Sequence, residues 1–332
     1  MDSYYKNKLG LLKDIFGAVT VEAFDDRVII DGRVLPVIDD VIILLEQAVM
    51  PPSVKRRLSI DDLAPAEAEF SEEVQYSFGA EWTKYPEILP EHVDEFNQYF
   101  DLVDLGSLKG ARSMDLGCGI GRWSYFLKDL CKEMILVDFS EAIFVARKNL
   151  RGSDNCVFIM ADITKLPFRS DAADFILCLG VLHHLPMDAL AATRYLGKFA
   201  PRVLIYLYYA LDNRPVYFRA LLAVATIVRL AVSRIRHEGL RSIFTLLVAA
   251  LVYRPFILIG QALRPLGLSS SVPLYEGYHG KSLGRIQQDV YDRFFTTIEQ
   301  RVSRSQIMTL RDSYSKITVS ENIPFWHFLL ER

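Results

Sequence analysis

Residues 113–123 have the sequence SMDLGCGIGRW, and this stretch decides the fold. Glycine stands at every second position, at Gly117, Gly119 and Gly121, shortly after Asp115, and a helical pattern, GRWSYFLKDLCK, follows. A glycine turn between a strand and a helix lets a ligand approach the backbone, where the helix N-terminus offers free N–H groups. The stretch therefore predicts a ligand-binding turn in an open α/β sheet.

The glycine spacing argues against a dinucleotide as this ligand. The dinucleotide fingerprint is GxGxxG, whereas this chain has GxGxG, with Arg122 and Ser124 where the two registers would need glycine. A carboxylate at Asp115 would repel a pyrophosphate but suits a positively charged ligand. S-adenosylmethionine carries an ammonium and a sulfonium and no phosphate. We therefore expect it as the cofactor, with S-adenosylhomocysteine as the product.

Two further acids end the next predicted strands. MILVDF contains Asp138 and CVFIMAD ends in Asp162. An acid at the tip of the second strand can accept hydrogen bonds from both ribose hydroxyls. A carboxylate at the tip of the third strand can accept from an adenine amine. The three acids together predict one cofactor site at the carboxyl ends of three strands.

Strand and helix patterns alternate from residue 110 to 208, and KITVSE and FWHFLLE form a terminal hairpin. This order predicts an α/β fold with a doubly wound, mostly parallel, seven-stranded sheet. We assign residues 109–212 and 310–332 to this core. Residues 1–50 are expected to form a small β-rich unit, 51–108 a linker and cofactor lid, and 213–309 a helical insertion after the fifth strand.

The segments DLGCGIGRW, VDFSEAIFVARKN, ADITKLPF and ADFILCLGVLHHLP, with the terminal hairpin, resemble class I S-adenosylmethionine-dependent methyltransferases over about 110–210 and 315–332. The resemblance implies that Gly117 and Gly119 pass under the methionine moiety, Asp138 holds the ribose, and Asp162 with Ile163 holds the adenine. One departure is FAPRV, where the family usually has a Pro-Gly-Gly turn. The cofactor candidates are Asp115, Gly117, Cys118, Gly119, Gly121, Asp138, Phe139, Ser140, Ala161, Asp162, Ile163, Leu179 and Trp82.

The N-terminal segment DGRVLPVIDDVIILL resembles the small zinc-ribbon-like module that often accompanies such enzymes. The metal cysteines of that module are missing, and the four cysteines of the chain form no CxxC pair. We therefore expect a degenerate ribbon without zinc, and no metal elsewhere.

His183 and His184, in GVLHHLP, are the candidate catalytic residues, because a histidine near the methyl group could take a proton from the acceptor. The alternative is that one of them packs against or caps the following helix. The Asn/Asp-Pro-Pro-Tyr/Phe motif of many N-methyltransferases of this fold is absent after the fourth strand. An oxygen or an activated carbon is therefore the expected acceptor.

Substrate contacts are expected from polar residues near the fifth strand and in the insertion. The segment YDRFFTTIEQRVSR resembles a tail of bacterial methyltransferases of the surface-polysaccharide and natural-product kind. FGAEWTKYP, with Phe78, Trp82 and Tyr85, could cover the cofactor or could be a packing cluster. The substrate candidates are Tyr208, Tyr275, Tyr278, His279, Asp292, Arg293, Glu299 and Arg301.

Residues 214–264 contain eight arginines, no lysine and one acid, Glu238, although the whole chain has a net charge of -3. This segment could be an ordinary helical cap, a membrane-surface element, a substrate lid or a homodimer surface. The overall charge gives no sign of nucleic-acid binding. The N-terminus has no signal-peptide pattern, and no uncharged apolar run is long enough to span a bilayer. We expect a cytoplasmic protein, with the inner face of the membrane as the alternative.

These patterns predict an S-adenosylmethionine-dependent O-methyltransferase acting on a sugar, nucleotide-sugar, lipid-linked glycan or related metabolite. The alternatives are a tRNA-modifying methyltransferase, suggested by the degenerate ribbon, and a lipid or quinone methyltransferase at the membrane surface. A cofactor-binding partner protein without activity is the third class. It would bind the cofactor tightly and turn over no substrate.

Overall fold

The structure, a computed structural model, describes residues 3–60, 86–235, 237–296 and 298–332. Within them, eleven strands form one sheet in the order β1-β2-β3-β4-β7-β6-β5-β8-β9-β11-β10. The strands are β1 (Val21–Ala23), β2 (Arg27–Ile30), β3 (Arg33–Ile38), β4 (Val41–Ile43), β5 (Arg112–Leu116), β6 (Glu133–Asp138), β7 (Cys156–Met160), β8 (Phe175–Leu179), β9 (Arg202–Tyr206), β10 (Lys316–Val319) and β11 (His327–Glu331).

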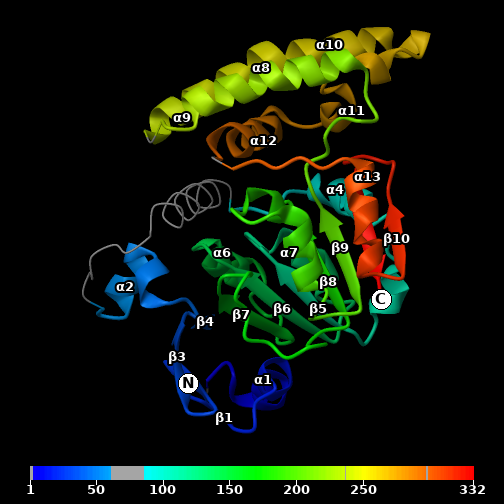
Figure 1. Cartoon of the computed structure of the whole chain (residues 1–332). Helices are drawn as coiled ribbons and strands as arrows, with labels where there is room; N and C mark the ends of the chain where they lie inside the picture. Colours follow the sequence, from blue (N-terminus) through cyan, green and yellow to red (C-terminus); the bar gives the residue numbers. More distant parts are fainter. Residues whose placement is uncertain (1–2, 61–85, 236, 297) are drawn as a thin grey trace.

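Helices cover both faces of the sheet and form a separate layer beyond its edge (Figure 1). The α-helices are α1 (Leu9–Phe16), α2 (Pro52–Arg57), α4 (His92–Tyr99), α5 (Arg122–Leu127), α6 (Ala142–Asn149), α7 (Ala189–Leu196), α8 (Val216–Val232), α9 (Glu238–Val248), α10 (Arg254–Leu263), α11 (Tyr275–Tyr278), α12 (Leu283–Phe295) and α13 (Arg304–Ile307).

The centre of the sheet is parallel, from β4 through β7, β6, β5 and β8 to β9. Its strands are continuous apolar runs because both of their faces are covered by helices. In β6, Ile135 and Val137 join the core cluster under α1 and α7, whereas Met134 and Leu136 join the cluster under α4, α5 and α6. The parallel pairing of β5, β6 and β7 places their carboxyl ends side by side at one edge, where open α/β sheets bind ligands.

The prediction of a seven-stranded sheet was wrong in its count. Seven strands occupy the predicted positions, but β1–β4 continue the same sheet, since β4 pairs in parallel with β7 through Val41 and Phe158. The Tyr5 hydroxyl lies 2.6 Å from the carbonyl oxygen of Asp40 and accepts a hydrogen bond from the Phe158 N–H. Residues 21–43 therefore extend the sheet edge, which the resemblance to a small zinc-ribbon-like module did not predict.

No group of three or more His, Cys, Asp or Glu side chains suited to a metal ion occurs among the described residues. All four cysteines are buried and free, and they lie in the methyltransferase-like core rather than in the N-terminal strands.

The chain between β9 and β10 builds the helical layer at the top of Figure 1. Here α12 lies between the sheet and the outermost helices α8, α9 and α10, and it contacts both α8 and α9. A π turn, Ala249–Tyr253, joins α9 to α10 just before Pro255, whose ring removes a backbone N–H and interrupts the regular ladder. The layer has its own apolar core, formed by Tyr253, Ile257, Ile286, Val290, Tyr291 and Phe295 among others.

Candidate active site

The glycine turn follows β5 and opens directly into α5. Gly117, Gly119 and Gly121 all have positive φ angles, of 76°, 53° and 74°. A Cβ atom on Gly117 would lie 2.4 Å from a methyl carbon of Val181, and one on Gly121 would lie 2.6 Å from a methyl carbon of Leu150. The prediction that a ligand requires these glycines is thus incomplete, because neighbouring side chains of the protein also require them. Gly117 and Gly119 line a large cavity, and Gly121 does not.

Asp138, at the end of β6, contacts the glycine turn that follows β5. One carboxylate oxygen accepts from the Gly119 N–H at 2.8 Å, and the other accepts from the Ser140 N–H at 2.8 Å and the Ser140 hydroxyl at 2.7 Å. Burial raises the pKa of Asp138, and these hydrogen bonds oppose the rise. Asp138, Phe139 and Ser140 all line the cavity.

Asp115 has a different position from the one expected. Its carboxylate is buried and accepts a 2.6 Å hydrogen bond from the Ser124 hydroxyl in α5, and it is not part of the cavity wall. Burial raises its pKa to about 7, the Ser124 hydrogen bond opposes this, and the charge of Asp138 adds to it. Asp115 therefore ties α5 to β5, and the structure does not bring it to the cavity where the charged ligand was expected.

The loop after β7 supplies the third acid. Asp162 accepts from the Thr164 N–H at 2.8 Å and the Thr164 hydroxyl at 2.6 Å, and it lines the cavity together with Ile163. Ala161 is buried behind them and does not reach the cavity. Cys118 and Leu179 complete this end of the wall. Trp82, with the proposed lid residues Phe78 and Tyr85, lies outside the described residues.

The two histidines after β8 have different surroundings. His183 is fully buried and stacks on Tyr208, with ring centroids 3.9 Å apart. Burial, with the nearby charges of His184 and Arg301, lowers its pKa well below the usual value. His183 is not part of the cavity wall, whereas His184 is. The sequence proposed both histidines, and the structure brings only one to the cavity.

The tautomer of His184 follows from its neighbour. Its Nδ1 lies 2.8 Å from the carbonyl oxygen of Ile298, which can only accept a hydrogen bond. Nδ1 must therefore carry the proton, so Nε2 of the neutral ring is the basic nitrogen. A ring with this tautomer on a cavity wall is suited to general-base work.

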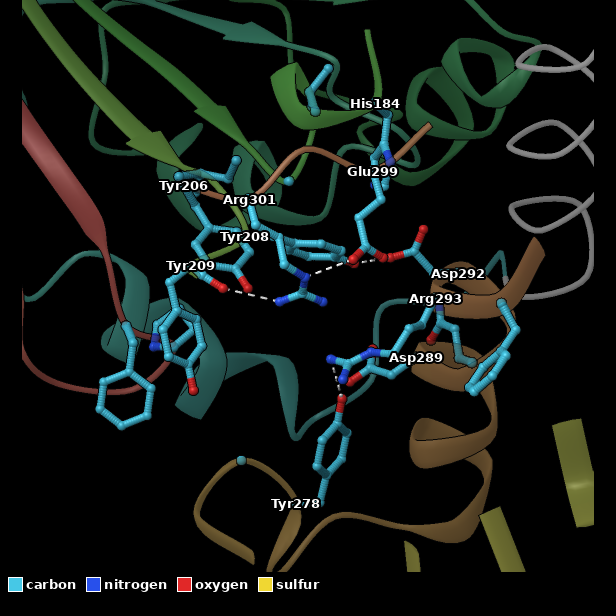
Figure 2. Close-up of a pocket in the computed structure, with 18 of the residues that line it drawn as sticks. His184, Tyr206, Tyr208, Tyr209, Tyr278, Asp289, Asp292, Arg293, Glu299 and Arg301 are labelled. Carbon is cyan, nitrogen blue, oxygen red and sulfur yellow. Dashed lines mark hydrogen bonds and ion pairs between the residues drawn. The ribbon is translucent and has the colours of Figure 1, made fainter. Parts of the chain in front are cut away.

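Polar side chains from the insertion surround the same space in Figure 2. The Tyr208 hydroxyl donates to Asp292 at 2.9 Å. Arg301 donates to Glu299 at 2.7 Å and to the carbonyl oxygen of Tyr209 at 3.1 Å. Burial raises the pKa of Asp292, while the charge of His184 and the Tyr208 hydrogen bond oppose the rise. His184 and Asp292 thus lie close to each other at the cavity wall.

The remaining substrate candidates divide into two groups. Tyr278 and Arg293 line the cavity, and the Arg293 guanidinium lies 3.4 Å from the Tyr278 hydroxyl. Tyr275 and His279 stack on each other and are not part of the cavity wall. Tyr275 fills the space left by Gly260, where a Cβ would be only 2.2 Å from its ring. The structure therefore places Tyr275 and His279 in the packing of α10 and α11.

The sequence analysis missed a buried charged cluster beside the glycine turn. Glu95, in α4, accepts from Arg285 at 3.0 Å and pairs with Lys281 at 2.7 Å and Arg122 at 3.4 Å. Burial alone would raise the pKa of Glu95, but the three cations hold it well below its usual value. Asp289 also pairs with Arg285, so the cluster has three cations and two carboxylates. The indication of this cluster in the sequence was Arg122, which directly follows Gly121 of the glycine turn.

Gly117, Gly119, Asp138, Asp162, His184 and the charged cluster around Glu95 line one cavity of about 900 Å³. This is near the upper end of the range for small-molecule sites, about 300–1,000 Å³. One end is polar and includes the glycine turn, Asp138 and Asp162; the other end lies among the helices of the insertion. The apolar residues at that end include Phe218, Leu221, Leu222, Val224, Val228, Phe244, Val248, Val252 and Phe256.

Comparisons with known proteins agree with this site. Residues 114–197 match the family model described as a methyltransferase domain. Two curated relatives are both named demethylmenaquinone methyltransferase. The one from Clavibacter sepedonicus is 39% identical over 66 residues, covering 20% of this chain and 27% of that protein. The one from Staphylococcus aureus strain JH9 is 27% identical over 101 residues, covering 29% and 42%. The chain thus spans less than half the length of either relative.

Among solved structures, a SAM-dependent methyltransferase from Aquifex aeolicus is 20% identical, over 38% of this chain and 71% of that one. Its TM-score of 0.34 is too low to support a functional inference. The family match covers β5 through α7, with the glycine turn, Asp138, Asp162 and both histidines. Residues 114–197 of this chain are thus similar to a methyltransferase domain.

Proposed function

We propose that this chain is an S-adenosylmethionine-dependent methyltransferase that acts on an oxygen or an activated carbon of a small amphiphilic acceptor. The observation that carries the proposal is the shared cavity wall of the glycine turn, Asp138, Asp162 and His184. This wall lies within the segment that matches the methyltransferase-domain model.

The residues at the polar end fit the parts of the cofactor. Three of the four lone-pair sites of the Asp138 carboxylate are filled by the hydrogen bonds described, and the oxygen that accepts from Gly119 keeps one for a ribose hydroxyl. Asp162 and Ile163 offer a carboxylate and an apolar surface for adenine. Arg122, which lines the cavity directly after the glycine turn, offers a guanidinium to the cofactor's own carboxylate. Bound S-adenosylmethionine would supply a methyl group activated by a positively charged sulfur.

The chain's own contribution is alignment and proton removal. Nε2 of His184 would accept the proton of the acceptor, while Nδ1–H stays fixed on the Ile298 carbonyl. Asp292 would then stabilise the protonated ring through its negative charge. Alignment of the reacting groups supplies the rest of the rate enhancement.

The choice of acceptor rests on the far end of the cavity. Its apolar lining from α8, α9 and the π turn favours an acceptor with an apolar part, such as a quinone, a lipid or a lipid-linked glycan. The name of the two curated relatives points in the same direction, although each match is partial. A free sugar is the second candidate, supported by the hydrogen-bonding groups of Tyr208, Asp292 and Arg301.

RNA is the less favoured acceptor. The exposed arginines of the insertion are separated by large exposed apolar side chains rather than arranged as a continuous basic surface. Phosphate-dominated binding needs many cations and depends steeply on salt. Co-purified RNA that dissociates with a steep salt dependence would reverse this preference.

Calorimetric titration with S-adenosylmethionine and S-adenosylhomocysteine tests the proposal. We expect micromolar binding by the wild type and a loss of at least about tenfold in Asp138→Ala, because a charge-assisted hydrogen bond to the cofactor disappears. Asp129→Ala is the matched control, since Asp129 is exposed and far from the cavity wall. A folded wild type that binds neither compound would refute the proposed function.

A further inference from the structure

The outermost helices of the insertion carry an apolar surface that faces solvent. It extends along α8 and along the continuous helical segment from α9 to α10. Exposed apolar surfaces of this extent are uncommon on soluble monomers and mark interaction sites. We call it the outer face; its large apolar residues are Val216, Val224, Ile227, Leu230, Leu240, Ile243, Leu246, Leu247, Leu251, Leu258, Ile259 and Leu266.

The charged residues of the outer face have one sign. Arg219, Arg234, Arg254 and Arg264 are exposed, and none makes an ion pair with a described residue. Between residues 213 and 275 the sequence has one acid, Glu238, and its carboxylate already accepts from the Tyr291 hydroxyl. The partner of this face must therefore offer apolar contact and negative charge together.

The cavity reaches this surface. Leu221, Val224 and Val228 of α8, and Val252 of the π turn, line the cavity and are also exposed to solvent. Walls from both α8 and the α9–α10 segment thus form an apolar mouth that opens on the outer face. An acceptor with an apolar tail could reach His184 through this mouth without passing through water.

The outer helices are arranged to lie along a surface. The segment Glu238–Leu266 is the one described helix long and apolar enough to cross a membrane. Its other side is fixed to the protein, since Arg241 donates to the Tyr291 hydroxyl and Gln287 donates to the Ser242 carbonyl oxygen. A helix with one face packed and one apolar face flanked by arginines is typical of an interfacial element.

We propose that the outer face docks on an anionic lipid bilayer and that the acceptor enters the cavity from the bilayer through the mouth between α8 and the π turn. The second part rests on the proposed function; the docking does not. A second copy of this chain is the competing occupant. Pairing two outer faces would bring eight arginines together with no carboxylate between them, whereas anionic headgroups neutralise them.

Flotation of the full chain with vesicles tests the docking. We expect binding to phosphatidylcholine vesicles that contain phosphatidylglycerol and much weaker binding to phosphatidylcholine alone. Ile227→Asp should lower the partition coefficient at least about tenfold, because an aspartate must lose its water in the interface. Arg219→Gln and Arg264→Gln should each lower it about fivefold on anionic vesicles.

Val34→Asp is the matched control. Both positions carry an exposed β-branched side chain, with 69% exposure at Ile227 and 57% at Val34, and neither lines the main cavity. Val34 lies in β3, at the opposite end of the molecule in Figure 1. Its variant should bind vesicles within about twofold of the wild type, because surface changes away from a binding face have small effects.

The outcomes separate the two parts of the proposal. No vesicle binding by the wild type, or equal binding by Ile227→Asp, overturns the docking. A dimer in sedimentation that Ile227→Asp dissociates, without vesicle binding, overturns it in favour of a second copy.

Labelled methyl transfer into a membrane lipid extract tests the entry route. Ile227→Asp should lose labelling of vesicle-borne lipid and keep it for detergent-dispersed lipid, with cofactor affinity unchanged. Equal loss in both media overturns the entry route. Vesicle binding without any S-adenosylmethionine binding supports docking and refutes the proposed function instead.

Discussion

The sheet edge and the outer face of the insertion differ in which kind of side chain they bury and which kind they expose. At the sheet edge, buried polar groups such as the Asp138 carboxylate accept hydrogen bonds from the protein, here from Gly119 and Ser140. On the outer face, apolar groups such as Ile227 and Leu251 are exposed, with 69% and 68% of their surface in solvent. The first arrangement has its hydrogen-bond partners within the chain, whereas the second is where we propose contact with a bilayer.

The contrast shows where each region obtains its stability. The sheet edge is held by hydrogen bonds and by close packing around the glycines. The insertion is held from its inner side, where Ile286, Val290 and Phe295 pack under the outer helices. The two regions meet at His184 and Asp292, so catalysis would depend on their relative position.

The largest expected effect is at this meeting point. His184→Ala should lower methyl-transfer turnover by about 10²- to 10⁴-fold, because a general base contributes about that much. His183→Ala should chiefly lower stability, since His183 is buried against Tyr208 and off the cavity wall. Turnover and calorimetric cofactor affinity would be measured for both variants. Undiminished turnover in His184→Ala would remove the base role.

The second largest expected effect is a pH dependence of stability that arises from Asp115. Its carboxyl has a pKa of about 7 in the folded chain, against about 4 when unfolded. Between about pH 4 and 7, the Asp115 carboxyl is protonated in the folded chain and ionised in the unfolded chain. Its contribution to the free energy of unfolding therefore falls as the pH rises from about 4 to 7, and it stays constant above about pH 7. The full fall is roughly 4 kcal/mol.

Urea unfolding of wild type and Asp115→Asn at several pH values measures this slope. Because asparagine cannot titrate, the free energy of unfolding of Asp115→Asn should not fall between about pH 4 and 7. The stability of this variant relative to the wild type should therefore increase as the pH approaches about 7. Asp129→Asn, at an exposed position, should keep the wild-type slope. An unchanged slope in Asp115→Asn would assign the pH dependence to another group.

The smallest of the three effects compares two glycines with similar φ angles. Gly117→Ala should lower the free energy of unfolding by roughly 3 kcal/mol, because its Cβ meets Val181 and its φ is positive. Gly110→Ala has open space around it and should cost only about 1 kcal/mol for its φ. Urea unfolding measures both variants.

Adding Val181→Ala to Gly117→Ala sharpens the comparison. Removing the two methyl groups of Val181 relieves the contact, so the double variant should be more stable than the sum of the single changes predicts. Strict additivity would show that backbone conformation alone explains the cost at Gly117.

The sequence by itself determined the parallel core and the cofactor end of the cavity. A strand, a glycine turn and a helix follow one another within a few residues, so local pattern fixes their order and puts Asp138 and Asp162 at neighbouring strand ends. The match of residues 114–197 to a methyltransferase domain supports the predicted fold of this segment, and the cofactor contacts stay predictions. The acceptor and the membrane contact stay predictions.

Only the tertiary structure decided which way similar residues face. Asp115 turns to Ser124 while Asp138 reaches the cavity, and Arg241 is buried while Arg219 is exposed. The same holds for the addition of β1–β4 to the sheet edge and for the pairing of Glu95 with Arg285. These outcomes depend on contacts between segments far apart in the chain, which spacing along the sequence does not encode. Local pattern sets what each segment forms, and the packing of distant segments sets which of its side chains meet a ligand.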